Sequence, residues 1–150
     1  NGITLRLDRN YETPINVFAD EERIQQVLTN LIINSLKYGI KKGVTEVSIE
    51  HTNDSKIWVR INDNGDGIGK EHLPRLFERF YRVDKGRGRG TGGSGLGLAI
   101  VKHIIEAHNE EIFVESKVGI GSEFSFSLSI IPSKENLNPY FRIKHKEGGE

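Results

Sequence analysis

The chain has 150 residues, enough for one domain that buries about 70% of the surface of its extended form. Lysine plus arginine and aspartate plus glutamate number 21 each, so no overall charge attracts the chain to nucleic acid or to an anionic membrane. Without cysteine, it has no disulfide, thiolate zinc site or thiol nucleophile. No apolar run is long enough for a membrane span or a signal peptide, so we expect a soluble segment, with a membrane anchor in a longer parent protein left open.

The first part of the chain predicts two short strands followed by a long helix. Residues 3–7 and 15–19 alternate as strands do, on either side of a polar turn. Asp20 is expected to cap a helix that ends near Tyr38, because two glutamates follow it in the first turn.

The remaining sequence predicts a hairpin, then two helices and two closing strands. Residues 44–51 and 56–63 alternate with period two, which predicts the hairpin. The later elements are expected as helices over residues 70–81 and 95–107 and strands over residues 111–116 and 123–131. Because strands and helices do not alternate strictly, we expect one mixed sheet with helices packed against it. Residues 132–150 lack apolar periodicity, which predicts a loosely held tail.

The first helix has a polar face and an apolar face. The polar face combines Arg23, Gln26, Asn30, Asn34 and Lys37, with Tyr38 at its edge. The apolar face combines Ile24, Leu28, Leu31 and Ile32. A polar stripe is most often a solvated surface, but asparagine costs up to ~0.7 kcal/mol against alanine in a helix. Two asparagines in mid-helix therefore indicate function, and an amide oxygen suits Mg²⁺, which needs few protein ligands.

Asp63 falls on the apolar side of its strand, in phase with Val59 and Ile61. An unpaired buried carboxylate is costly, so Asp63 needs a partner. One interpretation gives it a backbone N–H in a tight turn, which is frequent for aspartate before Asn-Gly. The other gives it an external partner such as a nucleobase amine, with Gly65 and Gly67 letting the backbone approach that ligand. This segment alone leaves both open.

Two further stretches indicate an anion site. Residues 75–89 are strongly basic and rich in glycine, which predicts a mobile loop able to close over an anion, or else a solvated disordered loop. In GTGGSGLGLAIVKHI (90–104), glycines run into apolar positions of helical spacing, so a helix is predicted to begin at Ser94 or Gly95. The N–H groups at such a helix start attract phosphate, and the glycines make room for it.

Taken in order, these stretches resemble the catalytic ATP-binding domain of bacterial sensor histidine kinases. NLIINSLKYG (30–39) resembles the N box, DNGDGIG (63–69) the first glycine box, and LFERFYRVD (76–84) the F box. GTGGSGLGLAIVKHI resembles the second glycine box, and VGIGSEFSFSL (118–128) is similar to the closing turn and strand. The likeness covers about residues 1–131, so we expect the catalytic domain there and a tail over residues 132–150.

The resemblance implies an α+β fold, the two-layer α/β sandwich known as the Bergerat fold. Its mixed, mainly antiparallel sheet would have about five strands packed on about three helices. A flexible ATP lid would lie between the F box and the second glycine box.

The resemblance also implies residue roles. Asn34 would hold Mg²⁺ with support from Asn30, while Lys37 and Arg82 would contact phosphate, and these four would form the catalytic set. The remaining nucleotide contacts are implied for Tyr38 against adenine, Asp63 to the adenine amine, and for Gly65, Gly67, Ile68, Phe80, Gly93, Ser94, Gly95, Leu96 and Gly97 around the base and the triphosphate. Phe77 would help Phe80 to anchor the lid.

The implied activity is that of a protein-histidine kinase in two-component signal transduction. The domain would bind Mg–ATP and pass the γ-phosphoryl group to a histidine of a dimerisation domain outside this chain, which would then phosphorylate the receiver domain of a response regulator. The isolated domain would be a slow, cytoplasmic monomer, and the parent protein a homodimer with or without a membrane anchor. No nucleic-acid partner is expected. The alternatives are a degenerate nucleotide-sensing or partner-binding module, and RNA binding through the Arg-Gly loop.

A few positions depart from the family pattern. Asp66 stands where proline or another residue is often found, and Ser122 where threonine is common. Asn109 stands where glycine is usual, which is tolerable because asparagine also adopts a left-handed conformation. None of the five histidines lies in the H-E-[LI]-[RK]-x-P context of a phosphoacceptor.

Overall fold

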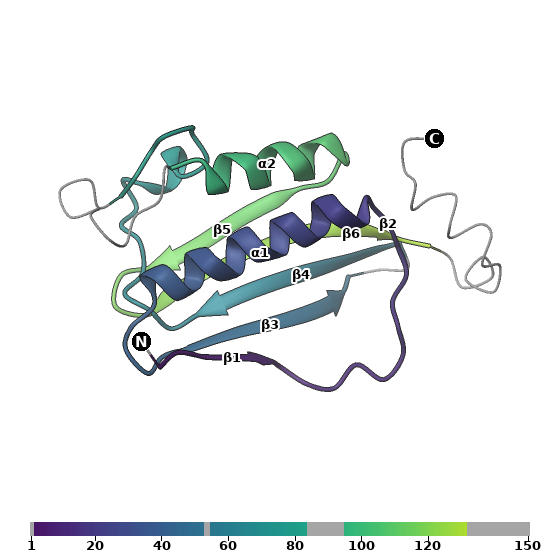
Figure 1. Ribbon diagram of the computed structural model, residues 1–150, viewed down its shortest axis with the longest axis horizontal. Helices are drawn as coiled ribbons and strands as arrows, with labels where there is room; N and C mark the ends of the chain where they lie inside the picture. The colour runs from purple at the N-terminus through teal and green to yellow at the C-terminus, as the bar shows by residue number, and fades with distance from the viewer. Residues whose placement is uncertain (1, 53–54, 84–94, 132–150) are drawn as a thin grey trace.

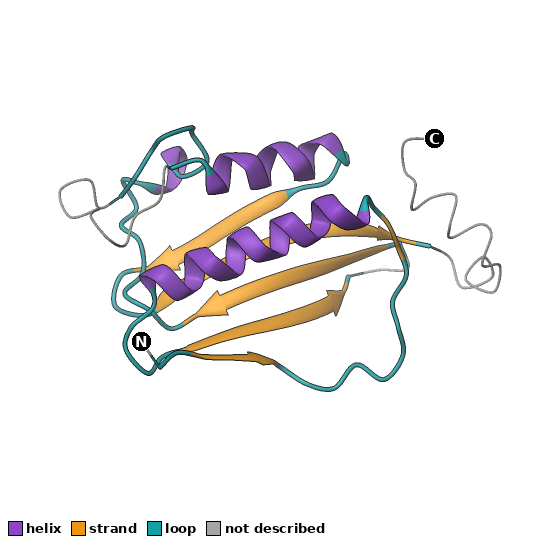
Figure 2. Ribbon diagram, viewed as in Figure 1, coloured by secondary structure: helices purple, strands orange, loops and turns teal. Residues whose placement is uncertain are grey.

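The computed structural model describes residues 2–52, 55–83 and 95–131. Its elements, in chain order, are β1 (Thr4–Leu7), β2 (Val17–Phe18), α1 (Glu21–Tyr38), β3 (Val44–His51), β4 (Lys56–Asp63), the 3-10 helix η1 (Leu73–Arg75), α2 (Gly97–Ala107), β5 (Ile112–Lys117) and β6 (Gly121–Ile130). Both α-helices lie on the same face of a single sheet, so the fold has two layers (Figures 1 and 2). The predicted α+β class and two-layer architecture are confirmed.

The sheet has six strands in the order β1-β3-β4-β6-β2, with β5 paired to β6. Only the β1–β3 pair is parallel among the described strands, so the sheet is mixed and mainly antiparallel, as predicted. The β3–β4 hairpin has the predicted bounds. Asp63, the last residue of β4, lies between Thr45 of β3 and Ser122 of β6. The register thus places this carboxylate at the end of a central strand.

Helix α1 begins and ends as predicted, but its buried face is shifted. The Asp20 carboxylate accepts a hydrogen bond from the Arg23 N–H at 3.2 Å, which confirms the cap. Val27, Leu31 and Ser35 are the buried residues of the helix. The predicted apolar residues other than Leu31 are only half-buried. Hydropathy could not place Ser35 inside, because its burial depends on a hydrogen bond to β3.

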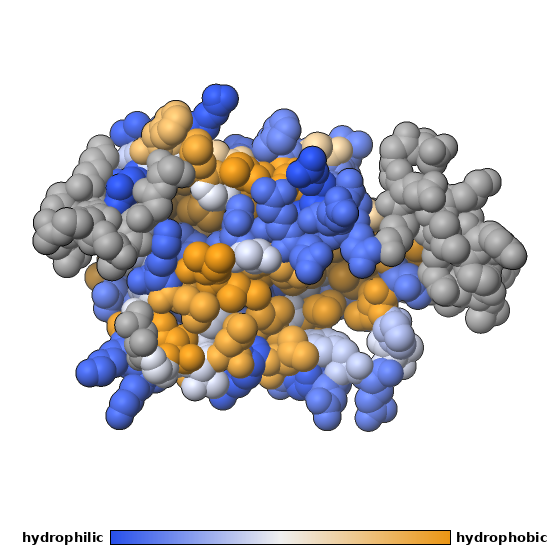
Figure 3. All heavy atoms as spheres, viewed as in Figure 1, coloured by the Kyte–Doolittle hydropathy of each residue, from blue (hydrophilic) through white to orange (hydrophobic). Residues whose placement is uncertain are grey.

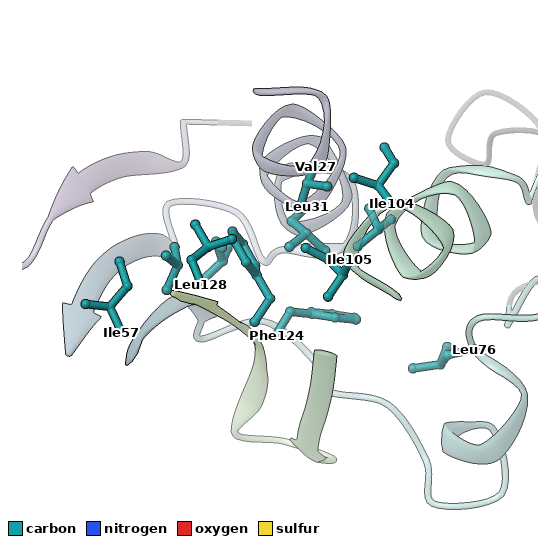
Figure 4. Packing of buried hydrophobic residues seen from close by; sticks show 12 residues of the cluster. Val27, Leu31, Ile57, Leu76, Ile104, Ile105, Phe124 and Leu128 are labelled. Atoms are coloured by element: carbon teal, nitrogen blue, oxygen red, sulfur yellow. The ribbon is translucent and has the colours of Figure 1, made fainter. Parts of the chain in front are cut away.

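The core fills the space between the two helices and the sheet. Leu31 of α1 and Ile105 of α2 meet Phe124 of β6 there (Figure 4). Leu76, after η1, extends the same cluster, and the neighbouring Phe77 packs edge-on against Phe124 with 6.2 Å between ring centroids. The segment after η1 is therefore anchored to the core.

Side-chain hydrogen bonds join α1 and its N-cap to both ends of α2. Near one end, the Asp20 N–H donates to Nε2 of His108 at 3.0 Å, and His108 Nδ1 lies 2.8 Å from the Ile104 carbonyl. Near the other end, Asn30 Nδ2 donates to the Gly97 carbonyl at 3.3 Å. These bonds fix the beginning of α2 beside the polar side of α1.

The sheet edge at β1 is less covered than its centre. Leu5 and Leu7 of β1 are 50% and 57% exposed, and Ile33 of α1 is 47% exposed. Figure 3 shows apolar side chains gathered on this face of the molecule, beside the charged surface of the helices. No helix within residues 2–52, 55–83 and 95–131 has the length and apolar character needed to cross a membrane.

The prediction of a helix over residues 70–81 is wrong. Backbone N–H groups of residues 72, 73, 75, 76 and 78 bond carbonyls three residues back, so the chain forms successive 3-10 turns. Pro74 has no N–H to donate, and Phe80 has a φ of 67°, which an α-helix does not tolerate. The described residues therefore hold two α-helices and one 3-10 helix.

Helix α2 begins later than predicted, at Gly97. Gly95 has a φ of 83°, in the left-handed region, so it cannot belong to the helix, and Leu96 precedes the first turn. Asn109 has a φ of 60°, the left-handed conformation anticipated for it. The closing strands lie within two residues of their predicted bounds.

Candidate functional site

A cavity of about 400 Å³ lies where β4 and α1 end and α2 begins. Its polar lining includes Asn30, Asn34, Lys37, Asp63 and Arg82. Its apolar lining includes Ile33, Ile68, Leu76, Val83 and Leu98. Segments that are far apart in the sequence thus meet around one space, whose volume is in the range of small-molecule sites.

Asp63 is held by hydrogen bonds on the wall of this cavity. Its Oδ1 accepts from the Gly65 N–H at 2.8 Å, and its Oδ2 lies 3.4 Å from the Ser35 hydroxyl. Burial raises the pKa of Asp63, although hydrogen bonds from Gly65, Ser122 and Ser35 oppose that shift. The structure thus provides the backbone partner in the turn, and the same carboxylate also faces the cavity.

Two buried hydroxyls fix the carboxylate from behind. Ser35 Oγ and Thr45 Oγ1 lie 2.6 Å apart, and these residues are 3% and 0% exposed. When the Ser35 hydroxyl donates to Asp63, its oxygen is left to accept from Thr45. The chain Thr45–Ser35–Asp63 therefore links the carboxylate to two buried hydroxyls.

The first glycine box packs against the turn between β5 and β6. Ser116 Oγ accepts from the Ile68 N–H at 2.7 Å, donates to the Gly121 carbonyl at 3.0 Å and lies 2.7 Å from Ser122 Oγ. The Gly119 N–H also donates to the Asp66 carbonyl at 2.8 Å. These bonds hold Ile68 and Ser122 in the cavity wall.

The glycines of this box serve the protein's own packing. A β-carbon on Gly65 would lie 2.8 Å from the Tyr38 carbonyl oxygen, and one on Gly67 would lie 2.1 Å from the Lys117 carbonyl oxygen. Gly67 also has a φ of 79°. The close approach at both positions is thus to backbone of this chain, so its own packing already requires glycine there. Gly67 still lines the cavity, whereas Gly65 lies outside its lining.

The polar side of α1 forms another wall. Asn30, Asn34, Lys37 and Tyr38 all line the cavity. Both asparagines are partly buried, while Lys37 is exposed. The Asn30 side chain donates to the Gly97 carbonyl in the first turn of α2. Asn34 lies one turn further along α1 and takes no part in that bond.

The second glycine box reaches the cavity at Gly95 and Gly97. A β-carbon on Gly95 would lie 2.7 Å from the Phe80 Cα, whereas one on Gly97 would meet no atom within 4 Å. Of these two glycines, Gly97 is the one with open space beside it. Leu96 is outside the cavity lining. Gly93, Ser94 and the predicted lid lie outside the described residues.

The F box divides its residues between core and cavity. Arg82 lines the cavity, and Phe77 packs on the core. Phe80 is 67% exposed and outside the lining, and its N–H donates to the Gly95 carbonyl at 2.8 Å. The backbone of Phe80, and not its ring, therefore connects the F box to the second glycine box.

Several lining residues were not assigned to the site from the sequence: Ile33, Leu76, Tyr81, Val83, Leu98, and also Asp66 and Ser122, which had been noted only as departures from a pattern. Ile33 could have been found, because it is three positions after Asn30 and four before Lys37 on a helix whose polar side was already assigned. Tyr81 was predicted in a helix and Val83 in a loop, so no sequence pattern indicated that both line the same cavity.

Comparison with known proteins identifies the family. A sequence model described as histidine kinase-, DNA gyrase B- and HSP90-like ATPase matches residues 19–131. The chain belongs to this family. Among similar ATPase-family proteins, the sensor histidine kinase WalK of Bacillus subtilis (strain 168) is 42% identical over 120 residues, which cover 79% of this chain and 19% of WalK.

Solved structures of histidine kinases share the fold. The mycobacterial sensor histidine kinase MprB has a TM-score of 0.72 and 26% identity, covering 87% of this chain and 84% of the solved one. Full-length ShkA in complex with AMPPNP has a TM-score of 0.70 and 26% identity, covering 87% of this chain and 26% of that one. The chain is thus a histidine-kinase-type ATPase domain, and it spans 19% of the length of WalK and 33% of that of the kinase SasA of Synechocystis.

Proposed function

We propose that this domain binds Mg–ATP in the cavity and transfers its γ-phosphoryl group to a histidine of a dimerisation domain outside these 150 residues. The observation that carries the proposal is the meeting of Asn34, Asp63 and Gly97 in one cavity. These three residues come from three separate sequence boxes, and each offers what a different part of the nucleotide requires. The similarity to ShkA, which was solved in complex with AMPPNP, supports the same assignment.

The lining fits the nucleotide in its chemistry. Apolar side chains such as Ile68 and Leu98 suit the faces of a purine, and the Asp63 carboxylate can accept a hydrogen bond from an exocyclic amine. Tyr38, 39% exposed, can cover the base from the end of α1. Lys37 and Arg82 carry the positive charge that phosphates need.

A Mg²⁺ ion fits this site if protein and phosphate oxygens coordinate it together. No group of three or more histidine, aspartate or glutamate side chains that could hold a metal occurs in the described parts of the chain. Mg²⁺ commonly keeps several waters and takes one or two protein oxygens together with phosphates, so the Asn34 amide oxygen is a sufficient protein ligand. When bound, the ion would offset negative charge on the phosphates.

In the proposed transfer, a nitrogen of the acceptor imidazole forms a bond to the γ-phosphorus while the bond from that phosphorus to the β–γ bridging oxygen breaks. ADP leaves with the electron pair, and the imidazole gives up its proton to solvent. Lys37, Arg82 and the N–H groups at the beginning of α2 would hold the phosphates in place, which is the main task of a protein in phosphoryl transfer. The phosphohistidine would then serve a response regulator in the cytoplasm.

Titration calorimetry with ATP and Mg²⁺ tests the binding step, and the Asn34→Ala variant tests the metal. We expect micromolar to millimolar affinity for the unchanged chain, with the dependence on Mg²⁺ lost in Asn34→Ala. Transfer of labelled phosphate to a supplied acceptor domain tests the kinase step. Binding without transfer would favour a nucleotide-sensing module, and RNA binding without competition from ATP would favour the Arg-Gly alternative.

A further inference from the structure

Tyr81 lines the cavity although it comes from a segment without regular helical structure. The left-handed conformation of Phe80 turns the chain just before it. Its hydroxyl oxygen lies 2.5 Å from Nδ1 of His72, nine residues earlier, and the two ring centroids are 5.9 Å apart. A side-chain contact therefore closes the loop that contains η1 and the F box.

A second side chain fixes the ring of Tyr81. The Arg75 guanidinium lies over this ring, 4.5 Å from its centroid, as in a cation–π contact. Arg75 is itself held by Glu78, whose Oε1 accepts from Arg75 Nε at 3.0 Å. Tyr81 is thus held at its hydroxyl by His72 and over one ring face by Arg75, while His72 stands outside the cavity lining.

A neighbouring carboxylate favours one direction for the hydrogen bond between His72 and Tyr81. The other ring nitrogen, Nε2, lies 3.5 Å from Glu71 Oε2. A carboxylate only accepts, so the tautomer that suits this neighbour has its proton on Nε2 and presents the lone pair of Nδ1 to Tyr81. The Tyr81 hydroxyl then donates to His72.

We propose that His72 is a positioning residue for the nucleotide cavity: its imidazole binds the Tyr81 hydroxyl and thereby fixes the Tyr81 ring as part of the cavity wall. The proposal rests on the proposed function, because the ligand that profits from the fixed ring is the nucleotide. His72 lies outside the family boxes and outside the cavity lining, and it would act on the site only through Tyr81.

A double-mutant cycle tests this role. His72→Phe and Tyr81→Phe each remove the hydrogen bond and keep an aromatic ring, so each should weaken ATP binding about three- to tenfold, the range for loss of one neutral hydrogen bond. The double variant should show the same loss as either single variant, since both remove the same bond. Losses that multiply would overturn the proposal.

Rescue separates positioning from general packing. In His72→Asn, the side-chain amide can place a polar atom near the position of Nδ1, so ATP affinity should return to within about twofold of the unchanged chain. His103→Phe, at an exposed position of α2, is the matched control and should leave affinity unchanged. Thermal midpoints of all variants are recorded. No rescue by asparagine, or a loss that follows the midpoint alone, would contradict the assigned role.

A nucleotide-free measurement distinguishes the two proposals. The ¹⁵N shift of His72 Nδ1 should change in Tyr81→Phe, because the ring nitrogen loses its donor. If that shift changes and the unchanged chain binds no ATP, the proposed function fails and this role fails with it. If ATP binds and the shift stays the same, only the role of His72 is overturned.

Discussion

Two carboxylates at opposite ends of β4, the buried Glu110 and the half-buried Asp63, differ in their partners. At the beginning of the strand, Lys56 donates to Oε1 of Glu110 at 2.5 Å, and the hydroxyls of Ser127 and Ser129 donate to the same carboxylate at 2.7 Å each. Burial opposes ionisation of Glu110, but the hydrogen bonds from Lys56 and the serines outweigh it and lower the pKa of its carboxyl.

At the other end of the strand, the partners of Asp63 are neutral donors, and burial raises the pKa of its carboxyl. Glu110 is paired with Lys56 of the same chain, so its charge is compensated without a ligand. Asp63 faces a cavity and gains from any further donor that enters it. The comparison favours a structural role for Glu110, which a cation accompanies, and under the proposed function a binding role for Asp63, which neutral donors hold beside the cavity.

Asp63→Asn should give the largest effect. The amide keeps the size of the side chain but loses the charge and one acceptor position, so ATP affinity should fall by about 100-fold, as for a hydrogen bond to a charged group. Calorimetry measures the loss. Glu110→Gln, the matched amide substitution at the other end of β4, should leave the affinity within about twofold. An Asp63→Asn variant that binds ATP as tightly as the parent would refute the assignment to the base.

Glu110→Gln should give the second largest effect, on stability. It removes the negative charge that Lys56 faces and reduces the acceptors available to two serines, so the free energy of unfolding should fall by about 2 kcal/mol. Urea unfolding followed by circular dichroism measures it. Asp63→Asn should cost clearly less, because the cost of burying a charge disappears with the charge. Equal losses in the two variants would show that both carboxylates are structural.

The pH dependence of stability should give the smallest effect, with opposite signs for the two residues. Glu110 has a folded pKa below its unfolded value of about 4.3, so its contribution is present above that pH and is lost as pH falls through the folded pKa. Asp63 has a folded pKa above its unfolded value of about 3.9, so in the window between the two values the folded state binds more protons and stability falls as pH rises.

Urea unfolding of the variants between about pH 3 and pH 6 separates these contributions. Glu110→Gln should make the loss of stability in acid shallower than in the parent. Asp63→Asn should make it steeper, because the opposing contribution of Asp63 is removed. Curves that shift in the same direction for both variants would contradict the comparison.

Patterns local to the sequence predicted much of this molecule. Period two gave the β3–β4 hairpin its bounds, and the capping role of Asp20 follows from residues within one turn. The same dependence on local patterns explains the error over residues 70–81. Apolar residues there have the spacing of a helix, but Pro74 lacks an N–H group and Phe80 adopts a left-handed conformation. The fold class could be predicted because the sequence boxes occur in order.

The contacts that complete the site and the fold join residues far apart in the sequence. Ser116 meets Ile68 across 48 positions, and Glu110 meets Lys56 across 54. Nothing in the spacing of serines or lysines indicates which of them will pair, since the pairing follows from strand register and from the angle at which helices leave the sheet. Sequence reasoning could therefore name Asp63 and Asn34 as site residues, but not the hydroxyls and the histidine behind the walls.

The open space beside Gly97 has a mechanical consequence. A methyl group there would meet nothing, so packing does not require glycine, yet glycine weakens a helix by up to about 1 kcal/mol relative to alanine. The first turn of α2 is thus easier to unwind than a turn built from alanine. The Gly97 carbonyl accepts a hydrogen bond from Asn30, so unwinding of this turn would change a contact of α1 one turn away from Asn34.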